Sequence, residues 1–221
     1  MKSSTLYPLV FADVALFSIV EDSLRVLLVQ RAEDPFQRRW ALPGGILKPD
    51  LDDSLQATAR RVLHNKVSVE IQHLEEIRTF SGPHRDPRGW SVAVLHCALL
   101  PCDQVHALVN NKVEALEWAD AQKPGHRMAF DHGEQLAVAL QTLRNRVAYP
   151  ALPLHLMPAQ FTLAALQQTC EIILGRRLDK AAFRRRVKGS PDLVELEGEK
   201  LHGPHVPAQL YRAREGFEFV V

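Results

Sequence analysis

The stretch Trp40-Ala41-Leu42-Pro43-Gly44-Gly45 interrupts a series of apolar segments near the start of the chain. A proline followed by two glycines predicts a turn with unusual backbone angles. Two earlier segments, 11–20 and 24–30, have the alternating or continuous apolar character of strands. The residues between them, Glu21-Asp22-Ser23, suit a tight connection. The sequence therefore predicts a pair of strands that leads into the glycine turn.

A helix is expected soon after the two glycines. Asp52, Asp53 and Ser54 can accept hydrogen bonds from the free backbone N–H groups of a helix start. Apolar side chains then recur at helical spacing and form one face, at Leu55, Ala59, Val62, Leu63 and Val67.

The segments after this helix alternate between apolar runs and polar connections. Residues 69–80 and 90–100 are predicted strands, and the polar loop 81–89 separates them. A strand near 115–118 and a helix over 131–146 complete the first part of the chain.

These features resemble a Nudix domain. The box of that family reads Gly, five residues, Glu, seven residues, then Arg-Glu-apolar-any-Glu-Glu-any-Gly-apolar. Its carboxylates hold Mg²⁺, which bridges a diphosphate and activates water. The best register places Asp53 at the first Glu and Arg61 at the Arg, with seven residues after Gly45 instead of five. The run Leu27-Leu28-Val29-Gln30-Arg31, followed by Trp40 to Gly45, resembles the strand and loop before the box.

The acids of the second half of the box are missing. Their positions are occupied by Val62, Asn65 and Lys66, and the second glycine is replaced by Ser68. An apolar group, an amide and a cation cannot build a site for a hard cation. We therefore expect no metal, no catalytic residue and no cofactor here, and a protein that is not an enzyme.

The C-terminal part predicts a second, smaller unit. Prolines in Tyr149-Pro150-Ala151-Leu152-Pro153 suggest a linker, so we expect a domain over residues 1–150 and another over 151–221. Thr162 can cap a helix over 163–174, and Asp179 can cap one over 180–188. Strands are expected at 193–197 and 209–213, an order typical of a winged helix-turn-helix. The expected fold class is α+β, with a Nudix-like α/β/α sandwich before the winged helix.

The second helix of this unit is strongly basic, although the whole chain carries a formal net charge of only +1. Phe183 and Val187 share one face and can anchor the helix, which leaves its arginines for solvent or a partner. Arginine suits phosphate oxygens and guanine edges, so double-stranded DNA is the expected partner. The candidate DNA-binding residues are Thr162, Lys180, Arg184, Arg185, Arg186, Lys188 and, in the wing, His202.

The two halves together resemble the NrtR family of Nudix-related transcriptional regulators of NAD metabolism, over nearly the whole chain. The resemblance implies a homodimeric repressor of NAD biosynthesis or salvage genes that binds a palindromic operator and is released by ADP-ribose. It rests most specifically on Trp40 to Gly45, Arg85 to Val92, Phe130-Asp131-His132, Phe161-Thr162-Leu163 through Val187, and Pro207 to Tyr211. Where the family often has Gly-Arg-Pro-Ala, this wing reads His205-Val206-Pro207-Ala208, which puts an arginine contact there in doubt.

A diphosphate ligand without metal needs cations or backbone amides. Trp90 offers either a face for adenine stacking or a core residue. Asp131 and His132 either meet a ribose hydroxyl or cap the following helix, and the cap is the favoured interpretation. The candidate ligand-binding residues are Arg31, Gly44, Gly45, Arg85, Arg88 and Trp90.

Composition indicates a cytoplasmic protein with no membrane partner. The apolar stretch 9–20 is broken by Asp13 and is shorter than the roughly 20 residues of a membrane span. Cys97, Cys102 and Cys170 have no metal-ligand spacing and suit free thiols.

Three alternatives remain open at this point. The chain could be a regulator of sugar catabolism with a pentose effector, or a protein-interaction module with an incidental basic helix. It could also be an active Nudix hydrolase that uses other carboxylates, such as Asp50, Asp52, Glu75 or Glu76.

Overall fold

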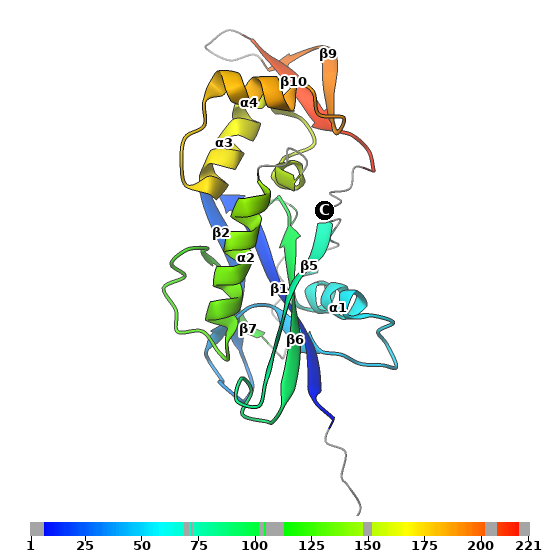
Figure 1. Cartoon of the computed structure of the whole chain (residues 1–221), viewed down its shortest axis with the longest axis vertical. Helices are drawn as coiled ribbons and strands as arrows, with labels where there is room; N and C mark the ends of the chain where they lie inside the picture. The colour runs from blue at the N-terminus through cyan, green and yellow to red at the C-terminus, as the bar shows by residue number, and fades with distance from the viewer. Residues whose placement is uncertain are drawn as a thin grey trace, which may run out of the picture.

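The computed structural model describes residues 7–68, 71, 73–101, 104, 113–147, 152–201 and 207–216. The elongated molecule has a large mixed sheet with two helices in its N-terminal part, and a helical unit with a small sheet at the other end (Figure 1). Among the described residues, no helix is long and apolar enough to cross a membrane.

The large sheet has seven strands in the order β3-β2-β1-β6-β5, with β4 added to β1 and β7 to β2. The long strand β1 runs parallel to β6 and antiparallel to β2 and β4. Positive φ angles at Glu21 and Asp22 form the tight hairpin turn that the sequence predicts. The bounds are β1 Leu9–Val20, β2 Ser23–Arg31, β3 Trp40–Ala41, β4 Gly44–Ile46, β5 His73–Gly82, β6 Ser91–Leu99 and β7 Val113–Asp120.

Two helices, α1 (Leu55–Val67) and α2 (His132–Arg146), cover opposite faces of this sheet. Alternate residues of β1 point to opposite faces, as in any strand. Val14 belongs to the core under α1, and its neighbour Ala15 belongs to the core under α2. The expected α/β/α sandwich is confirmed.

The caps of these helices agree with the sequence only in part. The Ser54 hydroxyl accepts a hydrogen bond from Ala57 N at 3.0 Å, as expected for the start of α1. The expectation that Asp131 caps α2 with its side chain is wrong for the described residues. Its carboxylate accepts hydrogen bonds from Arg85 and Gln135 instead.

The expectation of unusual backbone angles at the two glycines is also wrong. Gly44 and Gly45 lie in the short strand β4, which pairs with β1. Their lack of side chains matters because of close approach: a Cβ at Gly44 would collide with Oδ1 of Asp13. A Cβ at Gly45 would lie 2.6 Å from Cγ2 of Val62 on α1.

The C-terminal unit is the expected winged helix. Thr162 and Asp179 cap its two main helices, and Gly175 ends the first in the left-handed conformation. A two-residue strand that the sequence did not predict adds a third member to the wing sheet, whose order is β8-β10-β9. The elements are the 3-10 helix η2 (Leu152–Leu156), β8 (Phe161–Thr162), α3 (Leu163–Leu174), α4 (Lys180–Val187), β9 (Leu193–Leu201) and β10 (Ala208–Ala213).

The two parts share a hydrophobic core. The predicted linker lies partly outside the described residues, but its end, Leu152-Pro153, is buried and belongs to η2. Leu152 joins a core that contains Leu143 of α2 and Ile173 of α3. The Arg144 Nε also donates to the Ile173 carbonyl oxygen at 3.1 Å. The α/β/α sandwich and the winged unit are therefore packed directly against each other.

Candidate functional site

A cavity of about 260 Å³ opens beside β1 and β4. It brings together Arg31, Gly44, Gly45, Arg85 and Arg88, which come from distant parts of the chain and which the sequence analysis selected. Its walls also include two aromatic rings, four acids, a lysine and a histidine: Phe11, Phe130, Asp13, Glu33, Asp34, Asp86, Lys66 and His132.

Trp90 is the exception among the predicted ligand-binding residues. It is 47% exposed and is not among the described residues that line the cavity. The core interpretation is wrong, because Trp90 lies just before β6 at the surface, and its stacking on adenine stays a prediction. Phe11 and Phe130 supply the aromatic faces of the cavity instead.

Arg85 is held in a buried polar network. Its guanidinium donates to both carboxylate oxygens of Asp131 at 2.8 Å and to the Ser91 hydroxyl at 3.1 Å. Burial opposes ionisation of Asp131, but the bonds from Arg85 and Gln135 outweigh it and keep the pKa of this carboxyl below its usual range. Arg85 therefore shapes the cavity wall as half of an ion pair.

Arg88 and Arg31 lie over the Phe130 ring, with guanidinium carbons 5.8 and 4.9 Å from its centroid. Arg88 pairs with Asp86 at 2.6 Å and keeps 43% of its side chain exposed. Arg31 instead donates to the carbonyl oxygens of Pro35 and Glu33. Burial lowers the pKa of Arg31, and the neighbouring Arg88 charge adds to that effect. Both cations are presented to the cavity on a rigid aromatic support.

Sequence reasoning missed Asp13 and Gln135. Asp13 is buried in the middle of β1, and its Oδ2 accepts a hydrogen bond from Gln135 Nε2 at 3.0 Å. His132 Nε2 lies 3.6 Å from the same oxygen, while its Nδ1 accepts from Leu42 N at 2.9 Å. The proton of a neutral His132 is thus on Nε2, facing Asp13. Burial lowers the pKa of His132 despite this acid. For Asp13 the sequence did contain a signal, because it is a single acid inside an otherwise apolar strand.

Arg61, at the arginine position of the Nudix register, is held by an ion pair. The acid that pairs with Arg61 is Asp52, next to the Asp53 that the register places at the first Glu, with Arg61 Nε 2.6 Å from Asp52 Oδ1. Hydrogen bonding by Arg61 holds the pKa of Asp52 far below its usual range. Thr58 and the Lys48 backbone N–H also donate to this carboxylate. Asp52 therefore ties the loop before α1 to the helix, and Asp53 is exposed.

The chemistry of this cavity does not fit a magnesium ion. On the α1 side, Val62 is buried against Gly45, and Lys66 Nζ donates to the Gly44 carbonyl oxygen at 2.8 Å. Within the part of the chain that the structure describes, no three His, Cys, Asp or Glu residues gather as metal ligands. The alternative acids Asp50, Asp52, Glu75 and Glu76 do not belong to the described lining of the cavity.

A second hollow lies on the winged unit, between α4, the start of α3 and β10. Arg184 and Arg185 of α4 and Lys188 just after it line this hollow, together with Gln209 and Tyr211 of β10. Phe183 and Val187 are buried, which fixes the exposed face of α4 as expected. Thr162 also borders the hollow, but its hydroxyl accepts from Ala165 N as the cap of α3.

The remaining DNA-binding candidates divide into two groups. Lys180 and Arg186 are exposed on α4 but do not belong to the described lining of the hollow. His202 lies outside the described residues.

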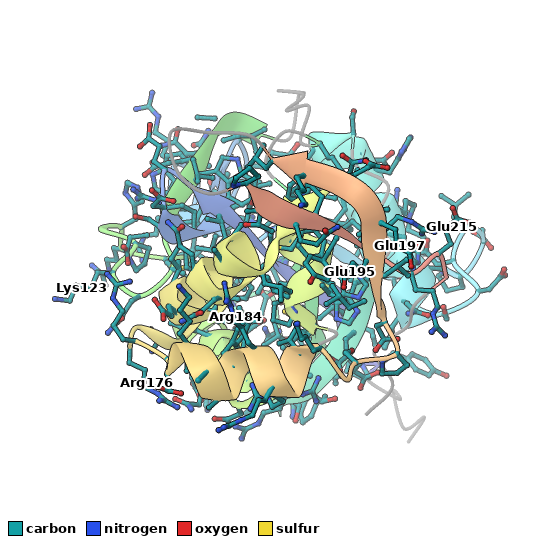
Figure 2. The ribbon with its side chains drawn as sticks, turned by 90° about the horizontal axis from the view of Figure 1, so that it is seen from above. Lys123, Arg176, Arg184, Glu195, Glu197 and Glu215 are labelled. Carbon is teal, nitrogen blue, oxygen red and sulfur yellow. The ribbon has the colours of Figure 1, made fainter. Side chains whose placement is uncertain are left out.

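Charges of opposite sign meet at this end of the molecule. Figure 2 shows Arg184 on α4, and Glu195 and Glu197 on β9 across the wing. The Tyr211 hydroxyl donates to the Glu195 carboxylate at 3.4 Å. The arginines of α4 and these acids of β9 thus lie on different elements of the winged unit, and the basic side chains of α4 are the ones suited to phosphate groups.

Comparison with known proteins agrees with both halves of this geometry. A model of the NUDIX domain matches residues 11–139, and one of the NrtR DNA-binding winged helix domain matches residues 153–213. The chain is 40% identical to the ADPR responsive transcriptional repressor NtrR of Acinetobacter baylyi over 220 residues, which cover 99% of this chain and 87% of that protein.

Solved structures give the same picture. The crystal structure of Shewanella oneidensis NrtR complexed with a 27mer DNA matches with a TM-score of 0.84 at 32% identity, covering 93% of each chain. The cocrystal structure of the NUDIX domain of Shewanella oneidensis NrtR with ADP ribose matches at 33% identity and a TM-score of 0.59. That match covers 65% of this chain and 93% of the other.

Proposed function

The chain belongs to the NrtR family of Nudix-domain transcriptional repressors, and from this premise we propose that it represses NAD biosynthesis or salvage genes and is released from its operator by ADP-ribose. The observation that supports this proposal most strongly is that one chain holds both a ligand cavity and an exposed basic helix of a winged unit. A cavity walled by Arg31, Arg88 and Phe130 suits an aromatic nucleotide with a diphosphate. Arg184 and Arg185 lie on the exposed face of a winged helix.

The Nudix domain then acts as a sensor rather than an enzyme, with ADP-ribose as effector and no cofactor. Hydrolysis in this fold requires carboxylates that hold a cation and activate water. Val62, Asn65 and Lys66 occupy the corresponding positions. A phosphate-release assay over nucleotide diphosphates with Mg²⁺ or Mn²⁺ tests this point, and robust turnover would contradict it.

Helix α2 is the physical route by which occupancy of the cavity can reach the DNA-binding unit. Its first turns carry His132 and Gln135, which contact the cavity residue Asp13. Its last turns pack on α3 through Leu143 and Arg144. A ligand that favours one position of α2 would shift the population of the dimer toward a spacing of the two α4 helices that no longer fits successive major grooves.

The test is a gel-shift assay on the DNA upstream of the protein's own operon, titrated with ADP-ribose. We expect a sequence-selective complex of a homodimer with DNA that dissociates as ADP-ribose is added. Ribose and other pentoses serve as the comparison, because a regulator of sugar catabolism would respond to them. Unchanged operator affinity at millimolar ADP-ribose would overturn the proposed coupling.

A further inference from the structure

Lys66 is a cation that α1 contributes to the wall of the cavity. It lies in the last turn of α1, and its side chain is half-buried. Its Nζ donates to the Gly44 carbonyl oxygen at 2.8 Å, and both residues line the cavity. This bond fixes an ammonium group on the α1 wall, where the Nudix pattern would place a metal-binding carboxylate.

The acids around Lys66 do not form a site for a divalent cation. Asp13 accepts from Gln135 and faces His132, and Asp86 is bound by Arg88. Glu33 and Asp34 are exposed in the loop after β2. A divalent cation placed beside the ammonium would meet like-charge repulsion in a partly buried site. The cavity therefore disagrees with the magnesium chemistry of its fold.

We propose that the Lys66 ammonium takes the place of the divalent cation and binds the diphosphate of the effector directly, so that binding is independent of metal. Lysine presents a compact point charge, which suits phosphate oxygens and forms strong charge-assisted hydrogen bonds. Arg31 lines the same cavity as a second cation. This inference rests on the proposed function for the identity of the diphosphate ligand, ADP-ribose.

The substitution also explains how the ligand stays intact. A metal ion lowers the pKa of a bound water and so creates a nucleophile, whereas an ammonium only donates hydrogen bonds. Lys66 thus provides the charge attraction of a Nudix metal ion without its means of hydrolysis. A sensor benefits from this separation because its signal lasts as long as the ligand stays bound.

Isothermal titration of the full chain with ADP-ribose tests the proposal, once in EDTA and once with Mg²⁺. The wild type should bind with the same affinity, within about twofold, in both buffers. Lys66→Met should weaken binding by about tenfold to 100-fold in both, the loss expected for a charge-assisted hydrogen bond. Lys66→Arg should retain most of the affinity, and Lys66→Glu should be weaker than Lys66→Met because it repels the phosphates.

Lys123→Met is the matched control, because Lys123 is exposed in the loop after β7 (Figure 2) and does not belong to the described lining of the cavity. Its affinity should equal that of the wild type. Thermal unfolding of each variant is measured in parallel. A lower melting temperature of Lys66→Met with unchanged affinity would show that the lysine only ties α1 to β4, and would overturn the proposal.

The remaining outcomes separate this inference from the proposed function. Wild-type binding that requires Mg²⁺ overturns the role of Lys66, even if ADP-ribose releases the operator. If ADP-ribose fails to bind but ADP binds in EDTA in a Lys66-dependent manner, the effector assignment is wrong and the inference stands. If neither diphosphate binds, both are overturned.

Discussion

Asp13 and Gln135 are joined by a buried hydrogen bond of 3.0 Å, although they lie 122 residues apart in the chain. The bond connects the middle of the central strand to the first turns of α2. Gln135 Nε2 also donates to Asp131 at 2.8 Å, so one amide links two acids of the cavity region. Together with His132, which lines the cavity and also faces Asp13, it connects the cavity to the helix that packs on the winged unit.

We expect Gln135→Leu to weaken the coupling between ADP-ribose and DNA. The change keeps an apolar helix face but leaves the Asp13 carboxylate without this donor, at a cost of about 1–3 kcal/mol in stability. Operator affinity without ligand should persist, and more ADP-ribose should be needed for release. Gel-shift titrations measure this. Gln141→Leu, at an exposed position of the same helix, is the control. Equal release curves for Gln135→Leu and wild type would refute the role of α2.

Arg184→Ala with Arg185→Ala should weaken operator binding by about tenfold or more, since each arginine is placed to contact DNA. The slope of log affinity against log salt should become shallower by about one for each lost phosphate contact. Fluorescence anisotropy at several salt concentrations provides both values. Lys123→Ala should behave as the wild type, and an unaltered affinity of the double variant would favour the protein-interaction alternative.

Gly44→Ala should unfold or strongly destabilise the sandwich, because the new Cβ would collide with the buried Asp13 carboxylate. Overpacking of this kind costs about 1–3 kcal/mol in the free energy of unfolding. Gly133→Ala is the matched control: its Cβ would meet nothing within 4 Å. Because Gly133 lies in the first turn of α2, that change should be neutral or stabilising by up to about 1 kcal/mol. Urea unfolding compares the two.

Stability should fall as the pH drops from about 6.5 towards 4, owing to a histidine pair between the two parts of the molecule. His73 of β5 and His155 of η2 stack with ring centroids 4.5 Å apart. Burial lowers the pKa of His73 to about 4, with Arg146 adding to the effect, and lowers that of His155 to about 3. Glu75 is the acid that faces His73, at 3.9 Å.

The sign follows from proton binding. Between the unfolded pKa near 6.5 and the folded values, the unfolded chain binds protons that the folded chain rejects. The contribution of the two histidines to the free energy of unfolding is therefore fully present above about pH 6.5. Below that pH it declines by up to about 1.4 kcal/mol per pH unit for each histidine. His155→Leu should reduce this slope in urea unfolding between pH 7.5 and 5. A variant with an unchanged slope would assign the effect to other groups.

The elements of the fold were predictable because their signals are local. The spacing of apolar residues predicted which face of α1 is buried. Ser54, Thr162 and Asp179 each cap a helix as expected. Short pieces escaped prediction for the opposite reason. The two-residue strand β8 has no period of its own and exists because Leu210 and Tyr211 pair with it.

The cavity was predictable in its cations but not in their partners. Arg85 was selected as a basic loop residue, yet its partner Asp131 is 46 residues away and was assigned to a helix cap. Such ion pairs depend on tertiary packing, which no sequence window contains. The pair of Arg61 with Asp52 is a second contact of this kind that the spacing did not reveal.

The continuous core through Leu143, Leu152 and Ile173 has a consequence for how such molecules diversify. The Nudix domain and the winged helix domain cannot be exchanged between relatives as independent units, because a cut near residue 150 exposes apolar side chains on both pieces. A viable chimaera must carry η2 together with matching surfaces of α2 and α3. New effector specificities would therefore arise by changes within the cavity more readily than by recombination of whole modules.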